Sequence, residues 1–251
     1  MFLSADELKL AYGVDMGIAK AYVDRRVPDD NAYWKGRRLY MPPLTGFLFM
    51  PIFSDLCRRV GLPVSDLLSE GYLRLAEGIL DSAARLEAGG LDWRQHVEEC
   101  IQLAGPSPLN PVLYADLTAY LRGRPEAASI PLGMAYPSLN RADTYLISLC
   151  AIPFDARLRQ PVTEAWYALM VYFLLLDDLA DIRDDLKQQQ ENALVDAGLS
   201  EEGMRGIRRL IDLSHERMER VNPVMANRMD HKRASIDLSA ILRSALGGEA
   251  S

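Results

Sequence analysis

Hydrophobic positions recur every three or four residues along most of the chain, which is the spacing of amphipathic helices. Proline, glycine and capping residues separate these segments, and none shows the two-residue alternation of a β-strand. Ser4 followed by acidic residues has the form of a helix start, and Pro223 suits the first turn of another helix. The pattern therefore predicts an all-α protein of about nine helices. The expected ranges are 4–26, a helix that Gly61 and Pro63 close, 65–87, 91–104, 113–121, 140–151, 160–190, 200–221 and 223–246.

Composition narrows the class of protein. The 251 residues are 49% hydrophobic without a long uninterrupted apolar run, which predicts one soluble domain spanning residues 1–251 and no transmembrane segment. A formal charge of -7 argues against a nucleic-acid partner. Cys57, Cys100 and Cys150 are widely separated in apolar contexts, so we expect buried free thiols in a reducing cytoplasm. The acidic N-terminal segment lacks the pattern of a signal peptide, which also favours a cytoplasmic location.

The most distinctive stretch is an apolar helical run that ends in five carboxylates. At about 100° per residue these acids fall on or beside one stripe of a helix, where like charges repel one another. A bound cation would explain the arrangement, and oxygen ligands together with substrate phosphates suit Mg²⁺. The alternative is a solvated acidic helix end that Arg183 and Lys187 partly neutralise. The candidate metal ligands are Asp177, Asp178, Asp181, Asp184 and Asp185.

The same stretch carries a resemblance to known enzymes. The sequence FLLLDDLAD at 173–181 resembles the second aspartate-rich motif of trans-isoprenyl diphosphate synthases, commonly FQxxDDxxD, with Leu174 in place of the Gln. The overlapping acids at 181–185 are similar to the DxxED motif of squalene and phytoene synthases. The resemblance implies a single-domain helical bundle of the isoprenoid (terpenoid) synthase type. It also implies that Asp177, Asp178 and Asp181 act catalytically through Mg²⁺.

Substrate-binding candidates follow from the same resemblance. The segment KGRR at 35–38 resembles a diphosphate-binding signature of the family, and arginine offers paired donors to phosphate oxygens. Lys187 follows the acidic motif where the family frequently places a phosphate-binding lysine, and Arg141 lies where it often has a lysine. Phe173 and the aromatic residues before it are candidates to line a prenyl pocket, or are simply core. The substrate-binding candidates are thus Lys35, Arg37, Arg38, Lys187 and Phe173.

The chain departs from the family at the first aspartate-rich motif. Only Asp81 and Glu87 are acidic there, and six positions place them about 240° apart on a helix. The triad of terpene cyclases is also incomplete, since Ala226 stands between Asn222 and Asp230. Two functions therefore remain open. One is a Mg²⁺-dependent enzyme acting on an allylic isoprenyl diphosphate, by prenyl transfer or, with less support, by terpene cyclisation. The other is a non-catalytic prenyl-lipid binder or the partner subunit of a synthase, and the family further implies a possible homodimer.

Overall fold

The computed structural model describes residues 4–26, 31, 49–105 and 107–247. Within these residues the regular structure comprises thirteen α-helices with short 3₁₀ and π segments and no β-strand. The all-α prediction is confirmed, whereas the predicted number of about nine helices is too low. Backbone contacts divide the chain into two compact units. Unit 1 comprises the described residues of Met1–Leu132 and Asp143–Thr163, and unit 2 those of Gly133–Ala142 and Glu164–Ser251. The prediction of one domain spanning residues 1–251 stays a prediction.

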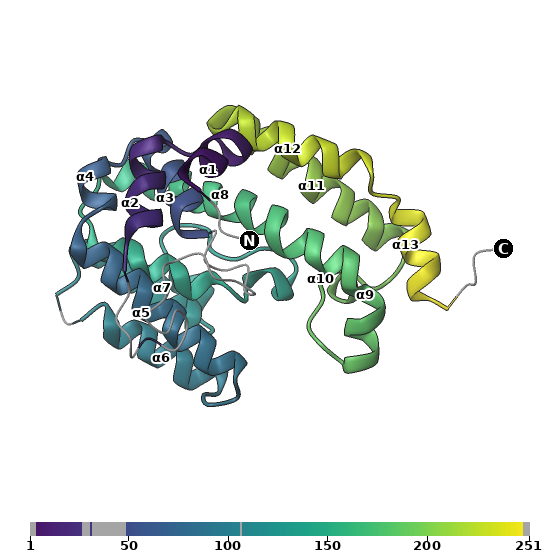
Figure 1. The fold of residues 1–251 in the computed structure, drawn as a ribbon. Helices are drawn as coiled ribbons and strands as arrows, with labels where there is room; N and C mark the ends of the chain where they lie inside the picture. The colour runs from purple at the N-terminus through teal and green to yellow at the C-terminus, as the bar shows by residue number, and fades with distance from the viewer. Residues whose placement is uncertain (1–3, 27–30, 32–48, 106, 248–251) are drawn as a thin grey trace. The chain divides into compact units, whose positions relative to one another are not determined.

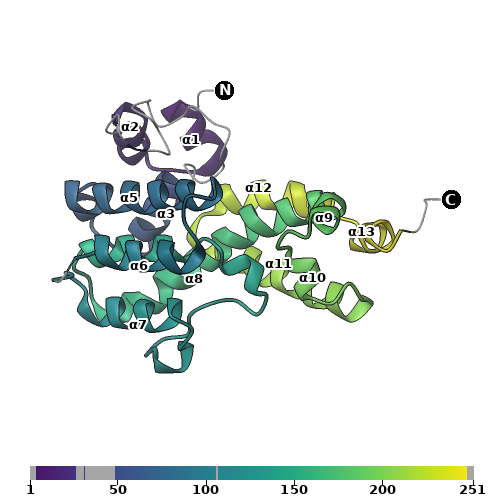
Figure 2. The same cartoon turned by 90° about the horizontal axis from the view of Figure 1, so that it is seen from below.

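Unit 1 is built around its longest helix, α5, which packs against α6 and η4. Figure 2 shows α5 and α6 running side by side. One face of α5 is apolar and buried, as its sequence pattern predicts, and the polar face turns to solvent. The elements of unit 1 are α1 (Ala5–Tyr12), α2 (Met16–Asp24), α3 (Phe49–Val60), α4 (Val64–Leu67), α5 (Glu70–Glu87), α6 (Trp93–Leu103), α7 (Pro111–Leu121), η2 (Pro125–Ala127), η4 (Asp143–Ala151) and η5 (Ala156–Leu158).

The N-terminal helix is interrupted, which corrects the prediction of one helix over 4–26. Ser4 starts α1 with a capping box, as expected. Gly13 then adopts φ 69°, a left-handed conformation that glycine tolerates and that ends the helix. Asp15 caps the next helix by accepting hydrogen bonds from the backbone N–H groups of Gly17 and Ile18. The Gly-x-Asp sequence therefore ends α1 and starts α2 within three residues.

Two buried carboxylates connect the helices of unit 1. Asp55 is fully buried and accepts hydrogen bonds from Nε of Arg58 at 2.9 Å and Nε of Arg59 at 2.5 Å. The backbone N–H of Asp15 donates a further bond to it at 3.1 Å, which ties the start of α2 to α3. Glu77 of α5 is similarly paired with Arg25, just after α2. Asp55 and Glu77 thus each have a guanidinium partner, which offsets the cost of burying their charge.

Unit 2 contains the predicted acidic stretch. α8 begins in unit 1 and continues through η6, a π-helix, into α9 without a break in the helix. α11 lies beside α12, as Figure 1 shows, and α13 packs against both α11 and α9. The elements of unit 2 are η3 (Pro137–Asn140), the later part of α8 (Arg159–Met170), η6 (Val171–Leu175), α9 (Leu176–Gln188), α10 (Ala193–Asp196), α11 (Glu201–Val221), α12 (Pro223–Ala234) and α13 (Leu238–Ala245).

Three other predicted helices differ in detail. The range 65–87 is divided between α4 and α5, where the side chain of Ser69 accepts a hydrogen bond from the backbone N–H of Tyr72 and starts the second helix. The range 140–151 contains a 3₁₀-helix over Asp143–Ala151 rather than an α-helix. The range 223–246 is broken between α12 and α13, where Oδ1 of Asp237 accepts a hydrogen bond from the backbone N–H of Ala240 and starts the second helix. These differences concern capping and turn geometry, while the hydrophobic period itself located the segments correctly.

The prediction of buried free thiols is confirmed, since Cys57, Cys100 and Cys150 are all buried and unpaired. Burial raises the pKa of Cys100 and of Cys150 to about 12, so both thiols are protonated at neutral pH. Among the described residues, no helix has the length and apolar composition needed to cross a bilayer.

Candidate functional site

The acidic stretch of α9 follows directly on the most deeply buried helix of unit 2. Trp166, Leu169 and Met170 of α8 and Leu175 of η6 have essentially no exposed surface. These apolar side chains hold the helix axis in place, so the acids that follow are presented from a rigid support. The π-helix η6 forms the end of this apolar run just before the acids, and such segments are frequently found at functional sites.

The five carboxylates do not share one environment. Asp178 is only 2% exposed and points into unit 2. Its Oδ1 accepts a hydrogen bond from Nη2 of Arg141 at 2.8 Å, and its Oδ2 accepts one from the backbone N–H of Ala193 at 2.8 Å. Burial raises the pKa of Asp178, while the charge of Arg141 and these hydrogen bonds oppose that rise. Asp178 therefore joins α9 to the segments that precede and follow it.

Asp185 and Asn192 extend this internal network. The side-chain amide of Asn192 donates hydrogen bonds to Oδ2 of Asp185 and to the backbone carbonyl of Asp178, both at 2.8 Å. Oδ1 of Asn192 accepts from the backbone N–H of Leu194 and starts α10. The loop after α9 is thus fixed by two of the five acids, which leaves the other three on the outside.

Asp177 and Asp181 are the outward pair. Both side chains are exposed and lie one helical turn apart on α9. Neither carboxylate has a hydrogen bond or an ion pair within the part of the chain that the structure describes. Partial burial and the charges of Asp181 and Asp185 raise the pKa of Asp177, and the positive charges of Arg141 and Lys232 act in the opposite direction. Charges of both signs therefore act on Asp177.

Two cations from α12 stand beside the π-helix that leads to this pair. Nε of Arg228 donates a hydrogen bond to the hydroxyl of Tyr172 at 3.0 Å. Nζ of Lys232, four residues later, lies 5.3 Å from the centroid of the Tyr172 ring, which is the range of a cation–π contact. Phe173 is half-buried and packs edge to face on Tyr172, with ring centroids 5.1 Å apart. The site thus combines two acids, two cations and an aromatic pair.

The remaining acid of the motif has a local partner. Asp184 accepts a hydrogen bond from Nζ of Lys187 at 2.9 Å, and both side chains are largely exposed. Exposed pairs of this kind contribute little to stability, so either residue remains available to a ligand. The predicted phosphate-binding residues Lys35, Arg37 and Arg38 lie outside the described residues.

Other sequence candidates have structural partners. In unit 1, Asp81 lies 3.3 Å from Nε of Arg85 on its own helix. Burial raises the pKa of Glu87. Asn222 is buried and caps α12 by accepting from the backbone N–H of Met225. Asp230 lies 3.0 Å from Nη2 of Arg233. The remaining polar residues of the two incomplete motifs, Asp81, Asn222 and Asp230, thus each have a partner within the protein.

In the described part of the chain, the carboxylates of α9 do not form a complete metal site by themselves. Within the described ranges, no group of three or more His, Cys, Asp and Glu side chains is arranged to hold one. Mg²⁺, however, is commonly bound by one or two carboxylates with substrate phosphates and water completing the octahedron. Asp177 and Asp181 fit this mode of binding, in which Mg²⁺ and a phosphate ligand bind together.

Comparison with known proteins gives no relative: no protein-family model, no curated protein and no solved structure matches the chain. The likeness to isoprenoid synthases therefore rests on the residues quoted above. Sequence reasoning missed Arg228 and Lys232, although their spacing of four residues on a helix was a readable sign that they share a face. It noted Arg141 only by its position, because nothing local predicts a contact with Asp178, 37 residues away.

Proposed function

We propose that this protein is a Mg²⁺-dependent enzyme that acts on an allylic isoprenyl diphosphate at the face formed by Asp177 and Asp181. The observation that carries the proposal is an exposed pair of acids on α9 with cations placed around the same helical run. Arg141 bonds to the adjacent Asp178, and Arg228 and Lys232 contact Tyr172 just before the acids. A magnesium diphosphate complex is itself of mixed charge. Its cation suits the carboxylates and its remaining phosphate oxygens suit the guanidinium and ammonium groups.

The chain's own residues would divide the chemistry between them. Asp177 and Asp181 would hold Mg²⁺, which supplies Lewis-acid stabilisation of the leaving diphosphate when bound. Lys232 and Arg228 would bind phosphate oxygens and neutralise the charge that grows as the carbon–oxygen bond breaks and its electron pair leaves with the diphosphate. The half-buried ring of Phe173 would shield the allylic cation that remains. Attack by an alkene with loss of a proton, or by water, would complete the reaction.

A second function has its own support. Asp178, the middle acid of the DDxxD sequence, has both oxygens engaged by Arg141 and Ala193. Asp81 pairs with Arg85 in the degenerate first motif. A protein whose motif residues serve structure in this way would bind a prenyl diphosphate without ionising it. It would then act as a lipid binder or as the partner subunit of an active synthase.

The test separates binding from turnover. Calorimetry with Mg²⁺ and inorganic pyrophosphate measures binding, and release of pyrophosphate from geranyl, farnesyl and geranylgeranyl diphosphates, with and without isopentenyl diphosphate, measures turnover. We expect the double variant Asp177→Asn/Asp181→Asn to weaken binding by at least about tenfold, which is about 1.4 kcal/mol. Asp184→Asn removes an equally exposed acid of the same helix and should leave binding nearly unchanged.

Each outcome has a distinct meaning. Tight binding together with Mg²⁺-dependent release supports the enzyme, and tight binding without release supports the binder or partner subunit. Lys232→Gln should weaken binding more than Lys187→Gln. Both are exposed helical lysines, but Lys232 lies against Tyr172 beside the proposed site, whereas Lys187 pairs with Asp184. Equal heats from the wild type and the Asp177/Asp181 double variant would reject both functions.

A further inference from the structure

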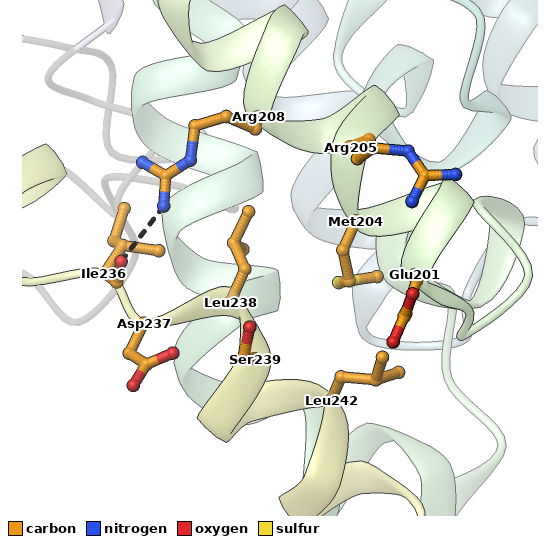
Figure 3. Close-up of a pocket in the computed structure, with 9 residues that line it drawn as sticks. All are labelled: Glu201, Met204, Arg205, Arg208, Ile236, Asp237, Leu238, Ser239 and Leu242. Atoms are coloured by element: carbon orange, nitrogen blue, oxygen red, sulfur yellow. Dashed lines mark hydrogen bonds between the residues drawn. The ribbon is translucent and has the colours of Figure 1, made fainter.

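A pocket of about 500 Å³ lies in unit 2 between α11 and the start of α13 (Figure 3). Its volume falls in the range of roughly 300–1,000 Å³ that is typical of small-molecule sites. All its lining residues come from α11, from α13 or from the turn before α13. None of them belongs to the acidic face of α9, so this pocket is separate from the proposed active site.

The middle of the pocket is apolar. Met204 of α11 and Leu238 of α13 are buried, and Ile236 and Leu242 are half-buried. Figure 3 shows Met204, Leu238 and Leu242 along the length of the pocket, with charged groups at its two ends. Such a lining favours the apolar body of a ligand, because covering it removes hydrocarbon surface from water.

The cations of the pocket carry unused hydrogen-bond donors. Nη2 of Arg208 donates to the backbone carbonyl of Ile236 at 3.1 Å, the contact that is dashed in Figure 3. Arg205, one turn earlier on α11, is exposed and has no hydrogen bond or ion pair within the described part of the chain. A guanidinium offers several N–H donors in a plane that matches a carboxylate, so Arg205 is ready to receive one.

The two acids of the pocket, unlike Arg205, interact with the backbone of a helix start. Asp237 caps α13 through its bond from the backbone N–H of Ala240 at 2.9 Å. Glu201 lies in the first turn of α11, where the helix dipole stabilises a negative charge. These two acids would also repel a strongly charged anion. The pocket is therefore suited to a ligand with an apolar chain and a single negative charge.

We propose that this pocket binds an amphiphilic monoanion of the fatty-acid type, with its chain along Met204, Leu238 and Leu242 and its carboxylate paired with Arg205. The head group would form a planar, two-point hydrogen bond with the guanidinium. Nothing in this assignment depends on Asp177 or Asp181.

The test uses the full-length protein with methyl-¹³C methionine and decanoate as the probe. The methyl signal of Met204 reports on the pocket, and that of Met218, a buried residue of the same helix, serves as the internal reference. Titration with decanoate should move the Met204 signal and leave the Met218 signal in place. Arg205→Gln should weaken binding by at least about tenfold, as expected for loss of a charge-assisted pair.

Arg209→Gln is the matched control, because Arg209 is also exposed on α11 but does not line the pocket. It should change the affinity by less than about twofold. Decanol and decylammonium should both bind more weakly than decanoate. The proposal is overturned if the Met204 signal does not move, if decanol or decylammonium binds as tightly as decanoate, or if the two arginine variants weaken binding equally.

Discussion

Asp55 in unit 1 and the Asp177–Asp181 pair in unit 2 show two different uses of a carboxylate. Asp55 is fully buried, and each of its oxygens accepts a hydrogen bond from an arginine of the same helix. Asp177 and Asp181 are exposed, have no such partner in the described part of the chain, and repel one another. The first arrangement stabilises the fold, whereas the second leaves negative charge available to something outside the protein.

The difference teaches how to separate structural acids from candidate ligands. Asp178 is adjacent in sequence to Asp177, yet it resembles Asp55 in kind. It is buried, and Arg141 and Ala193 donate hydrogen bonds to its two oxygens. A count of acids in a motif cannot make this distinction. The hydrogen-bond partners and the exposure of each carboxylate do make it. Variants that remove one charge at a time test the distinction.

The largest effect is expected for Asp55→Asn. The amide removes the charge that Arg58 and Arg59 require and places N–H donors against one of them. Breaking a buried pair typically destabilises a protein by 3–5 kcal/mol, and we expect about 3 kcal/mol because the two arginines keep 31% and 25% side-chain exposure. Urea unfolding at neutral pH measures the change. The variant Asp181→Asn is the comparison, and it should stay within about 0.5 kcal/mol of the wild type.

A smaller effect is expected for Asp178→Asn. The amide can accept from only one of the two donors and leaves the other without an acceptor, so we expect a loss of about 1–3 kcal/mol. The loss should be smaller than for Asp55, because burial already raises the pKa of Asp178 and makes its ionised form less favourable. A stability equal to that of the wild type would show that Asp178 has no structural role.

The smallest effect, with the opposite sign, is expected for Asp177→Asn. Burial and the nearby acids raise the pKa of Asp177 in the folded state above its ordinary value of 3.8, so the folded protein binds the proton more tightly. Its ionisation therefore lowers stability as the pH rises above 3.8. Because η6 continues into α9, no free helix N-terminus compensates for this cost.

Asp177→Asn should accordingly stabilise the protein by a few tenths of a kcal/mol at pH 7. The gain should disappear when the pH falls below about 3.8, where Asp177 is protonated in both states. Unfolding curves of the two proteins over this range measure the difference directly. A gain that persists at low pH would mean that side-chain packing, and not charge, is its cause.

The sequence predicted the parts of the fold that depend on local pattern. The helical class, the cap at Ser4 and the long helix over 160–190 all follow from hydrophobic period and capping chemistry. The break between α1 and α2 was also readable, since Gly13 suits a helix end and Asp15 a helix start. It was missed because the hydrophobic period continues across it.

The candidate site was only partly predictable. The acids of α9 were found from sequence, but the burial of Asp178 depends on Arg141, which is distant along the chain. The approach of Arg228 and Lys232 to Tyr172 likewise depends on tertiary packing of α12. Lys35, Arg37 and Arg38 stay predictions, since they lie outside the described residues.

The π-helix η6 also bears on how such a site can evolve. A turn closed between residues five apart holds about one residue more than an α-helical turn, so it absorbs a change of chain length inside a continuous helix. Insertion or deletion of one codon between Val171 and Leu175 would leave both flanking helices intact. The later side chains would also keep their faces, because the π-helical turn takes up or releases the one residue. The arrangement in which Asp178 faces inward and Asp177 outward can therefore persist when the length of this segment changes.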